Sequence, residues 1–105
     1  MKYNNGRKAF GFWEGMPYGD VTDSYGECRN YKNSISKERV IRHIDSLGVW
    51  ACSEPSYDMF TGEMFNCGLY MDGEFTFSVD FFRYYKKCDI GIPPEYEEYL
   101  KQILK

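Results

Sequence analysis

The segment from residue 63 to residue 79 constrains the fold more than any other part of the chain. Apolar side chains alternate there with polar or small ones on both sides of an Asp72-Gly73 pair. The apolar positions are Phe65, Cys67 and Leu69 before the pair and Phe75, Phe77 and Val79 after it. A period of two is typical of strands, and Asp-Gly is a common hairpin turn. The segment therefore predicts a β-hairpin.

The pairing within this hairpin follows from the requirement that both apolar rows share one face. A two-residue loop at the Asp-Gly pair would put the rows on opposite faces. A three-residue loop over 71–73 instead pairs Leu69 with Phe75 and unites the rows. It also places Gly73 where this loop type favours a left-handed residue. We expect the three-residue loop with a bulge, and an outer face of Asn66, Tyr70, Glu74, Thr76 and Ser78.

Two amphipathic helices are expected, over residues 36–47 and 93–105. Ser36 is a suitable N-cap for the first helix, and Gly48 follows it at a position that commonly ends a helix. Pro93 and its neighbour suit the first turn of the second helix, because an N–H would be unpaired there anyway. Both segments carry apolar residues at helical spacing, namely Val40, Ile41, Ile44 and Leu47, then Tyr96, Tyr99, Leu100 and Ile103.

The other segments are less regular. Residues 8–13 and 49–52 are expected to form short strands. Residues 81–85 include four aromatics and could continue a strand or begin a helical turn; a strand is favoured because no helix cap is evident. Residues 15–33 are rich in turn-forming residues and are interpreted as a long loop. The sequence predicts one α+β domain over 1–105, with a small antiparallel sheet of three to five strands and two helices packed on one face.

Composition limits the class of protein. The 105 residues include 13 Lys plus Arg against 16 Asp plus Glu, a net charge of −3. This balance disfavours a dedicated nucleic-acid binder. The longest apolar run, 49–52, is far shorter than the roughly 20 residues of a membrane span, and no secretory signal opens the chain. We expect a cytoplasmic protein with no membrane partner.

The four cysteines are expected to be reduced and to act as small apolar side chains. Cys28, Cys52, Cys67 and Cys88 include no close pair of the kind that holds zinc, and His43 is the only histidine. Two disulfides would need an oxidising compartment. His43 with Cys52 or Cys88 could form a base and nucleophile, but no nucleophile motif surrounds either cysteine. We expect no catalytic residue, no metal and no cofactor.

Three further groups carry weaker signals. Gly11, Gly15 and Gly19 recur every fourth residue, which is neither the Walker nor the dinucleotide-binding spacing. Two carboxylate groups could bind Mg²⁺ or Ca²⁺ but lack EF-hand order and are interpreted as solvated loop charges: Asp20, Asp23 and Glu27, then Asp58 and Glu63. Two basic groups could hold single-stranded nucleic acid by charge and stacking: Lys37, Arg39 and Arg42, then Arg83, Lys86 and Lys87 beside Tyr84 and Tyr85.

The chain is unusually aromatic, with ten Tyr, eight Phe and two Trp. The expected inner faces absorb about half of these rings by the usual face alternation. Exposed tyrosines beside Asp and Gly are typical of protein-binding surfaces. The alternative is that the rings pack loops onto the sheet. The candidate binding residues lie in the irregular N-terminal third: Trp13, Tyr18, Asp20, Asp23, Tyr25, Glu27 and Tyr31.

These features favour a non-catalytic binding or inhibitory protein with a protein partner. Small size, mild acidity and the lack of motifs are shared by many phage- and plasmid-borne inhibitors of bacterial defence systems, such as anti-CRISPR proteins. By this analogy of type, residues 13–31 would dock on a nucleic-acid-handling enzyme, with Asp20, Asp23 and Glu27 in place of phosphates. The alternatives are a nucleic-acid-binding module and a small metal-dependent hydrolase.

Overall fold

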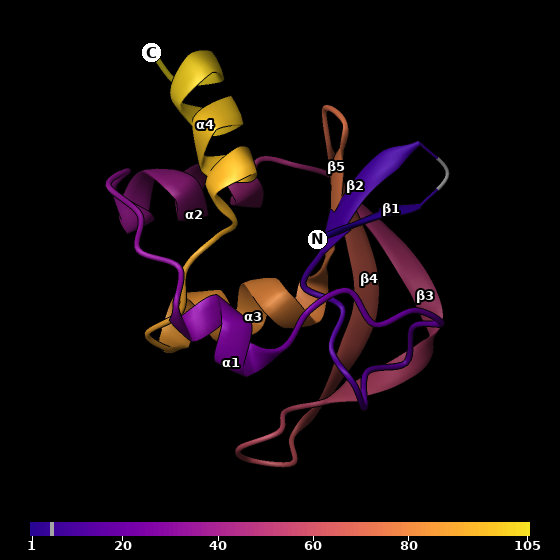
Figure 1. The fold of residues 1–105 in the computed structure, drawn as a ribbon. Coiled ribbons are helices and arrows are strands. Elements are labelled where there is room, and N and C mark those ends of the chain that lie inside the picture. The colour runs from indigo at the N-terminus through magenta and orange to yellow at the C-terminus, as the bar shows by residue number, and fades with distance from the viewer. Residues whose placement is uncertain (5) are drawn as a thin grey trace.

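A sheet forms one side of the molecule and helices form the other (Figure 1). The computed structural model describes residues 1–4 and 6–105, and within them it shows five strands and four helices. The strands are β1 (Lys2–Asn4), β2 (Arg7–Phe10), β3 (Val49–Tyr57), β4 (Met64–Asp72) and β5 (Phe75–Ser78). The helices are α1 (Tyr25–Arg29), α2 (Lys37–Asp45), α3 (Val79–Lys87) and α4 (Pro94–Ile103).

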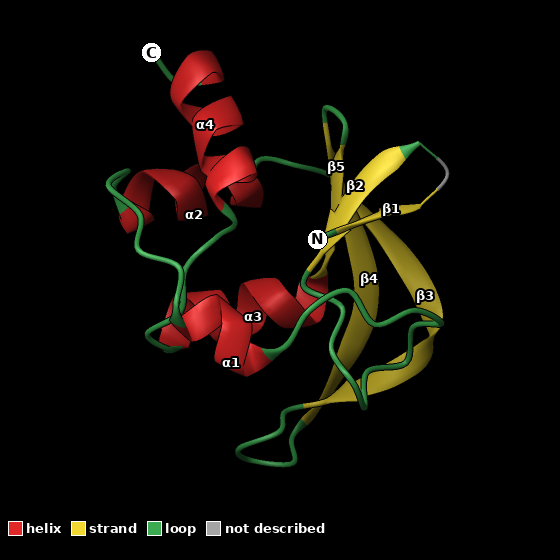
Figure 2. Ribbon diagram, in the orientation of Figure 1, coloured by secondary structure: helices red, strands yellow, loops and turns green. Residues whose placement is uncertain are grey.

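The predicted α+β class is confirmed, with more elements than expected. The sheet order is β1-β2-β5-β4-β3, and its pairs are antiparallel except for β2 with β5, which is parallel. The expected helices at 36–47 and 93–105 are present as α2 and α4. Figure 2 shows all the helices gathered on one side of the sheet. The strand predicted at 8–13 is present in part as β2, which ends at Phe10. Strand β3 continues beyond 52 through Pro55, which lies beside a register shift on the sheet edge, where proline is tolerated.

The hairpin exists, but the predicted register was wrong. Tyr70 pairs with Phe77, and Asp72 with Phe75, which leaves a two-residue loop in which Gly73 has a φ of +60°. The expected pairing of Leu69 with Phe75 is therefore not formed. Tyr70, predicted to lie outside, is buried beside the rings of Phe77 and Phe82. The expected outer residues Thr76 and Ser78 are buried as well.

The strand favoured over 81–85 was also wrong, because these residues form helix α3. Its N-cap is Ser78, whose hydroxyl accepts a hydrogen bond from the Phe81 amide at 2.9 Å. Four aromatic side chains of the helix are buried: Phe81, Phe82, Tyr84 and Tyr85. Burial of these four rings against the sheet stabilises the helix by more than a local preference for strand opposes it.

The long loop expected over 15–33 contains helix α1, capped by Ser24, and is held down at its start. The Gly11 amide donates to both carboxylate oxygens of Asp23, at 3.0 and 3.1 Å, and the Thr22 amide donates to the Phe12 carbonyl at 2.8 Å. The chain therefore doubles back between residues 11 and 23. Gly11 has a φ of +76°, and an added Cβ would lie 2.6 Å from Phe81, so this turn requires glycine.

The core between sheet and helices is built from stacked and edge-on rings. Phe10 stacks on Phe77 with centroids 4.8 Å apart and contacts Phe81 edge-on at 5.3 Å. Trp13 stacks on Tyr84 at 5.4 Å. Such pairs add about 0.5–1.5 kcal/mol each beyond area burial. Many of the twenty aromatic residues are therefore used in packing, as the alternative interpretation proposed.

Two buried carboxylates attach helices α2 and α4 to the rest of the fold. Asp72 accepts hydrogen bonds from the hydroxyls of Tyr96 at 2.7 Å and Tyr99 at 3.1 Å, and lies 2.8 Å from His43 Nε2. Glu97 accepts from the amides of Ser34 and Ile35. Burial raises the pKa of Glu97, but these amides and neighbouring polar groups outweigh it and hold that pKa below its usual range.

Candidate functional site

The predicted site residues of the N-terminal third do not form one exposed surface. Trp13 and Asp23 are buried, with 6% and 4% of their surface exposed, and the Asp23 carboxylate is occupied by the Gly11 amide. Tyr18, Tyr25 and Tyr31 are half-buried, whereas Asp20 and Glu27 are exposed. Only two of the three carboxylates predicted to mimic phosphates are therefore at the surface.

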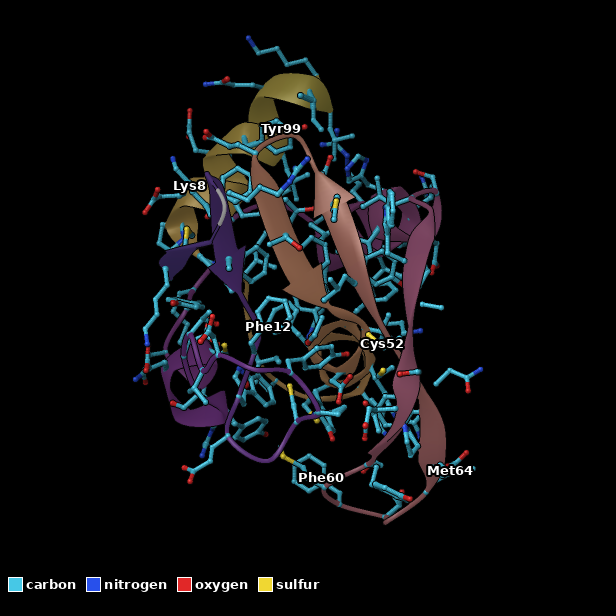
Figure 3. All side chains as sticks on the ribbon, turned by 90° about the vertical axis from the view of Figure 1, so that its right-hand side faces the viewer. Lys8, Phe12, Cys52, Phe60, Met64 and Tyr99 are labelled. Atoms are coloured by element: carbon cyan, nitrogen blue, oxygen red, sulfur yellow. The ribbon has the colours of Figure 1, made fainter. Side chains whose placement is uncertain are left out.

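Exposed apolar side chains occur instead along the edge strand β3, in its connection to β4 and at the first residue of β4. Six residues there are between 49% and 64% exposed: Val49, Trp50, Tyr57, Met59, Phe60 and Met64. We refer to these six as the β3–β4 edge. Elsewhere in the described residues, the exposed large apolar side chains are Val21 and Ile103. Figure 3 places Phe60 and Met64 at one end of the molecule, opposite Tyr99.

The loop that carries Met59 and Phe60 is held rigidly by Asp58, whose side chain is fully buried. Its Oδ1 accepts hydrogen bonds from the amides of Phe60 and Thr61, at 2.8 and 3.0 Å. Its Oδ2 lies 2.7 Å from Lys87 Nζ and 2.9 Å from Arg83 Nε. These two cations, with the loop amides, hold the pKa of Asp58 well below its usual range.

A pocket opens where this loop meets helix α3 and the chain after β2. It has a volume of about 270 Å³. Its lining consists of Trp13, Glu14, Gly15, Met16, Pro17, Pro55, Ser56, Tyr57, Met59, Asp80 and Tyr84. We refer to it as the Asp80 pocket, because Asp80 supplies a carboxylate that is 2% exposed. A second cavity of about 340 Å³, between the N-terminal loop and the sheet, has a mainly apolar lining that includes Phe12 and Leu69.

Within the described residues, the carboxylate of Asp80 is hydrogen-bonded through one of its two oxygens. Oδ1 accepts from the hydroxyls of Tyr18 at 2.7 Å and Ser56 at 3.0 Å. Burial, and the neighbouring Asp80 charge, raise the pKa of Tyr18, so that its hydroxyl remains a donor at neutral pH. The Tyr18 oxygen also accepts from the Gly68 amide at 3.1 Å. Tyr18, predicted as an exposed contact, is therefore a positioning residue for Asp80.

Several of the basic residues predicted as a nucleic-acid interface make contacts within the fold, whereas Arg42 is exposed and pairs with the exposed Glu38. Arg83 and Lys87 bind Asp58, and the Lys86 ammonium lies over the Phe82 ring, 4.6 Å from its centroid. In the first basic group, Lys37 lies over the Tyr85 ring at 4.5 Å. The basic side chains of α3 therefore contact other side chains of this protein.

The residues considered for catalysis do not meet. The ring of His43 is paired with Asp72, as described above, and neither Cys52 nor Cys88 is hydrogen-bonded to it in the described residues. Burial, with Cys67 alongside, raises the pKa of the Cys52 thiol to about 11. The four cysteines are free thiols in the structure.

Metal-binding clusters and membrane-spanning helices are absent from the part of the chain that the structure describes. No group of three or more His, Cys, Asp or Glu side chains is placed to hold a metal ion there. In the two predicted carboxylate groups, Asp58 and Glu63 both pair with Arg83, and Asp23 is bound by the Gly11 amide. None of the described helices has the length and apolar character needed to cross a membrane.

The fold and site define a small α+β protein with an apolar sheet edge beside a carboxylate pocket. No protein-family model matches the chain, and comparisons with curated proteins and with solved structures find no match.

The β3–β4 edge was missed by sequence reasoning, although one signal was present. Met59 and Phe60 are large apolar residues between Asp58 and Thr61-Gly62, in a segment otherwise typical of a turn. Apolar side chains in a tight turn have few partners available locally, and they commonly mark an interaction surface.

Proposed function

We propose that this chain is a non-catalytic binding protein that docks on a protein partner through the β3–β4 edge. The observation that carries the proposal is that six of the eight exposed large apolar side chains in the described residues lie along β3, on its loop or at the first residue of β4. Exposed apolar residues that cluster in this way are typical of interaction sites, whereas scattered ones are not.

The geometry of β3 supports docking by strand addition. β3 is the last strand of the sheet order, so one row of its backbone groups is not paired within the sheet. Natural edge strands are usually protected by charges, prolines or bulges. Strand β3 has one charge, Glu54, and Pro55 beside a register shift, so the parts of β3 on either side of this irregularity are the ones free to pair. An extended segment of a partner can pair with such an edge while its side chains contact Trp50 and Tyr57.

The rigidity of the loop supports the same proposal. Binding is weakened by the entropy lost when flexible loops become ordered. The four contacts to Asp58 fix the loop before any partner arrives, so Met59 and Phe60 are already presented. Inhibition of a bacterial nucleic-acid-handling defence enzyme remains a prediction, supported by the net charge of −3 and the exposed Asp20 and Glu27.

The proposal is tested by a nuclease-treated pull-down from bacterial lysate with the full chain as bait. The test variant is Trp50→Ser/Met64→Ser, which removes the two most exposed apolar side chains of the edge. The control is Val21→Ser/Ile103→Ser, which removes two exposed apolar side chains outside the β3–β4 edge. We expect one stoichiometric partner with the wild type and the control, and its loss with the test variant. Equal capture by both variants would place the interface elsewhere.

A further inference from the structure

In the described residues, Asp80 and Asp23 are the buried carboxylates without an ion pair, but Asp23 is bound through both oxygens by the Gly11 amide. Among the residues that the structure describes, no Lys, Arg or His nitrogen forms an ion pair with Asp80. Arg83 follows one turn later in α3, but its guanidinium is directed to Asp58. Two hydroxyls and the N-terminus of α3 stabilise the Asp80 charge without neutralising it.

The second carboxylate oxygen of Asp80, Oδ2, makes no hydrogen bond in the described residues, whereas Oδ1 accepts two. In the same part, the one fully enclosed side-chain polar atom without a partner is Trp13 Nε1. Oδ2 therefore reaches accessible space, and the space that Asp80 lines is the Asp80 pocket.

The walls of the pocket suit a cation on an aliphatic stem. Trp13, Tyr57 and Tyr84 contribute aromatic surface, and aromatic rings attract cations that lie close to them. Glu14 adds a second carboxylate to the lining. The volume of about 270 Å³ lies below the roughly 300–1,000 Å³ of typical small-molecule sites, which fits the end of one long side chain.

The pocket is continuous with the proposed docking surface. Tyr57 and Met59 belong both to the β3–β4 edge and to the pocket lining. A partner segment seated on the edge would therefore pass the pocket mouth. Resting on the proposed function, we propose that the Asp80 pocket receives the cationic side chain of a lysine or arginine from the partner, with Asp80 Oδ2 as its hydrogen-bond acceptor and counter-charge.

The test uses the free protein and blocked amino acids, so it does not depend on the partner. The full chain, labelled with ¹⁵N, is titrated with N-acetyl-lysine methylamide and with N-acetyl-arginine methylamide. The neutral analogues of norleucine and citrulline match these probes in shape without the charge. We expect weak binding of at least one cationic probe, seen as shifts of the Ser56, Tyr57 and Asp80 amide signals, and at least tenfold weaker binding of its neutral analogue.

Two variants test whether Asp80 is the carboxylate that binds the cationic probe. Asp80→Asn should weaken binding of the cationic probe at least tenfold, which corresponds to about 1.4 kcal/mol. Asp45→Asn, the same change at an exposed position on α2, should leave it unchanged. The comparison of charged and neutral probes in the wild type keeps the test valid if Asp80→Asn fails to fold.

The outcomes separate this inference from the proposed function. Equal shifts with charged and neutral probes, or no shifts with either cation, would overturn the cation pocket. Unchanged binding to folded Asp80→Asn would also overturn it. A partner that is lost with Trp50→Ser/Met64→Ser but with no probe binding would support the docking edge alone. Probe binding without such a partner would support the pocket and contradict the docking proposal.

Discussion

The loop around Asp58 and the pocket around Asp80 place two buried carboxylates beside the same helix, in contrasting environments. Asp58 is contacted by two cations and two amides, so its charge is fully compensated within the fold. Asp80 is contacted by two hydroxyls and no cation in the described residues. A buried charge that is paired internally holds structure, whereas one left unpaired beside a cavity can bind a charge from outside.

The largest expected effect on stability comes from neutralising Asp58, the carboxylate that is paired with cations within the fold. Asp58→Asn should lower the free energy of unfolding by about 2–4 kcal/mol, because it weakens two charge-assisted contacts inside the fold. Urea denaturation measures this loss. Glu63→Gln, which removes an exposed partner of Arg83, is the matched control and should cost under about 0.5 kcal/mol. Equal small losses for both variants would contradict the structural role of Asp58.

Acid should remove the same stabilisation. The pKa of Asp58 is depressed in the folded protein, so its contribution is fully present above the unfolded pKa near 4 and is lost as pH falls below that value. The stability difference between wild type and Asp58→Asn should therefore be constant above about pH 5 and shrink toward pH 2. Urea titrations across this range measure it. A stability difference that grows on acidification would contradict the depressed pKa of Asp58 in the folded protein.

Neutralising Asp80 should have a much smaller effect on stability. The amide oxygen of Asp80→Asn can still accept from Tyr18 and Ser56, and no cation of the described residues loses its partner. We expect a change in the free energy of unfolding of less than about 1 kcal/mol, measured in the same urea assay. A loss as large as that of Asp58→Asn would show that Asp80 serves the fold rather than a ligand.

The smallest expected effect is at the docking edge. Trp50→Ser/Met64→Ser changes side chains that are 64% and 63% exposed, so the melting temperature should stay close to that of the wild type. Differential scanning calorimetry provides this measurement. A large drop in the melting temperature would mean that these residues stabilise the sheet, and the loss of a partner could then not be assigned to docking.

The elements predicted best are those whose signal is local. Helix α2 begins after Ser36, as its cap and apolar spacing indicated, and the hydroxyl accepts from the Arg39 amide. Helix α3 was missed because Ser78, its cap, was counted as part of a strand. The sequence shows the serine, but its role depends on the buried rings that hold the helix against the sheet.

The hairpin register shows why longer-range features were not predictable. The pattern favoured a face containing Cys67 and Leu69, whereas the fold turns Tyr70 and Asp72 toward the core. Asp72 is retained there by Tyr96 and His43, which lie 24 and 29 residues away along the chain. Partners at such separations are supplied by the assembled fold, so a pattern within the hairpin does not contain them.

The same limit explains the missed site. Arg83 stands three residues after Asp80, a helical spacing that permits an ion pair between them. The structure instead directs Arg83 to Asp58, from the loop before β4, and so leaves Asp80 without a cation. This one tertiary contact therefore contributes to the rigid loop and also draws away the cation nearest to Asp80 along α3.

Site-specific photo-crosslinking in bacterial cells tests the central claim most directly. A photoreactive phenylalanine analogue is placed at Met64, on the β3–β4 edge, and separately at Ile103, an exposed apolar position on α4. We predict a crosslink from position 64 to one partner protein and none to that protein from position 103. A partner that crosslinks from position 103 and not from position 64 would contradict docking through the β3–β4 edge.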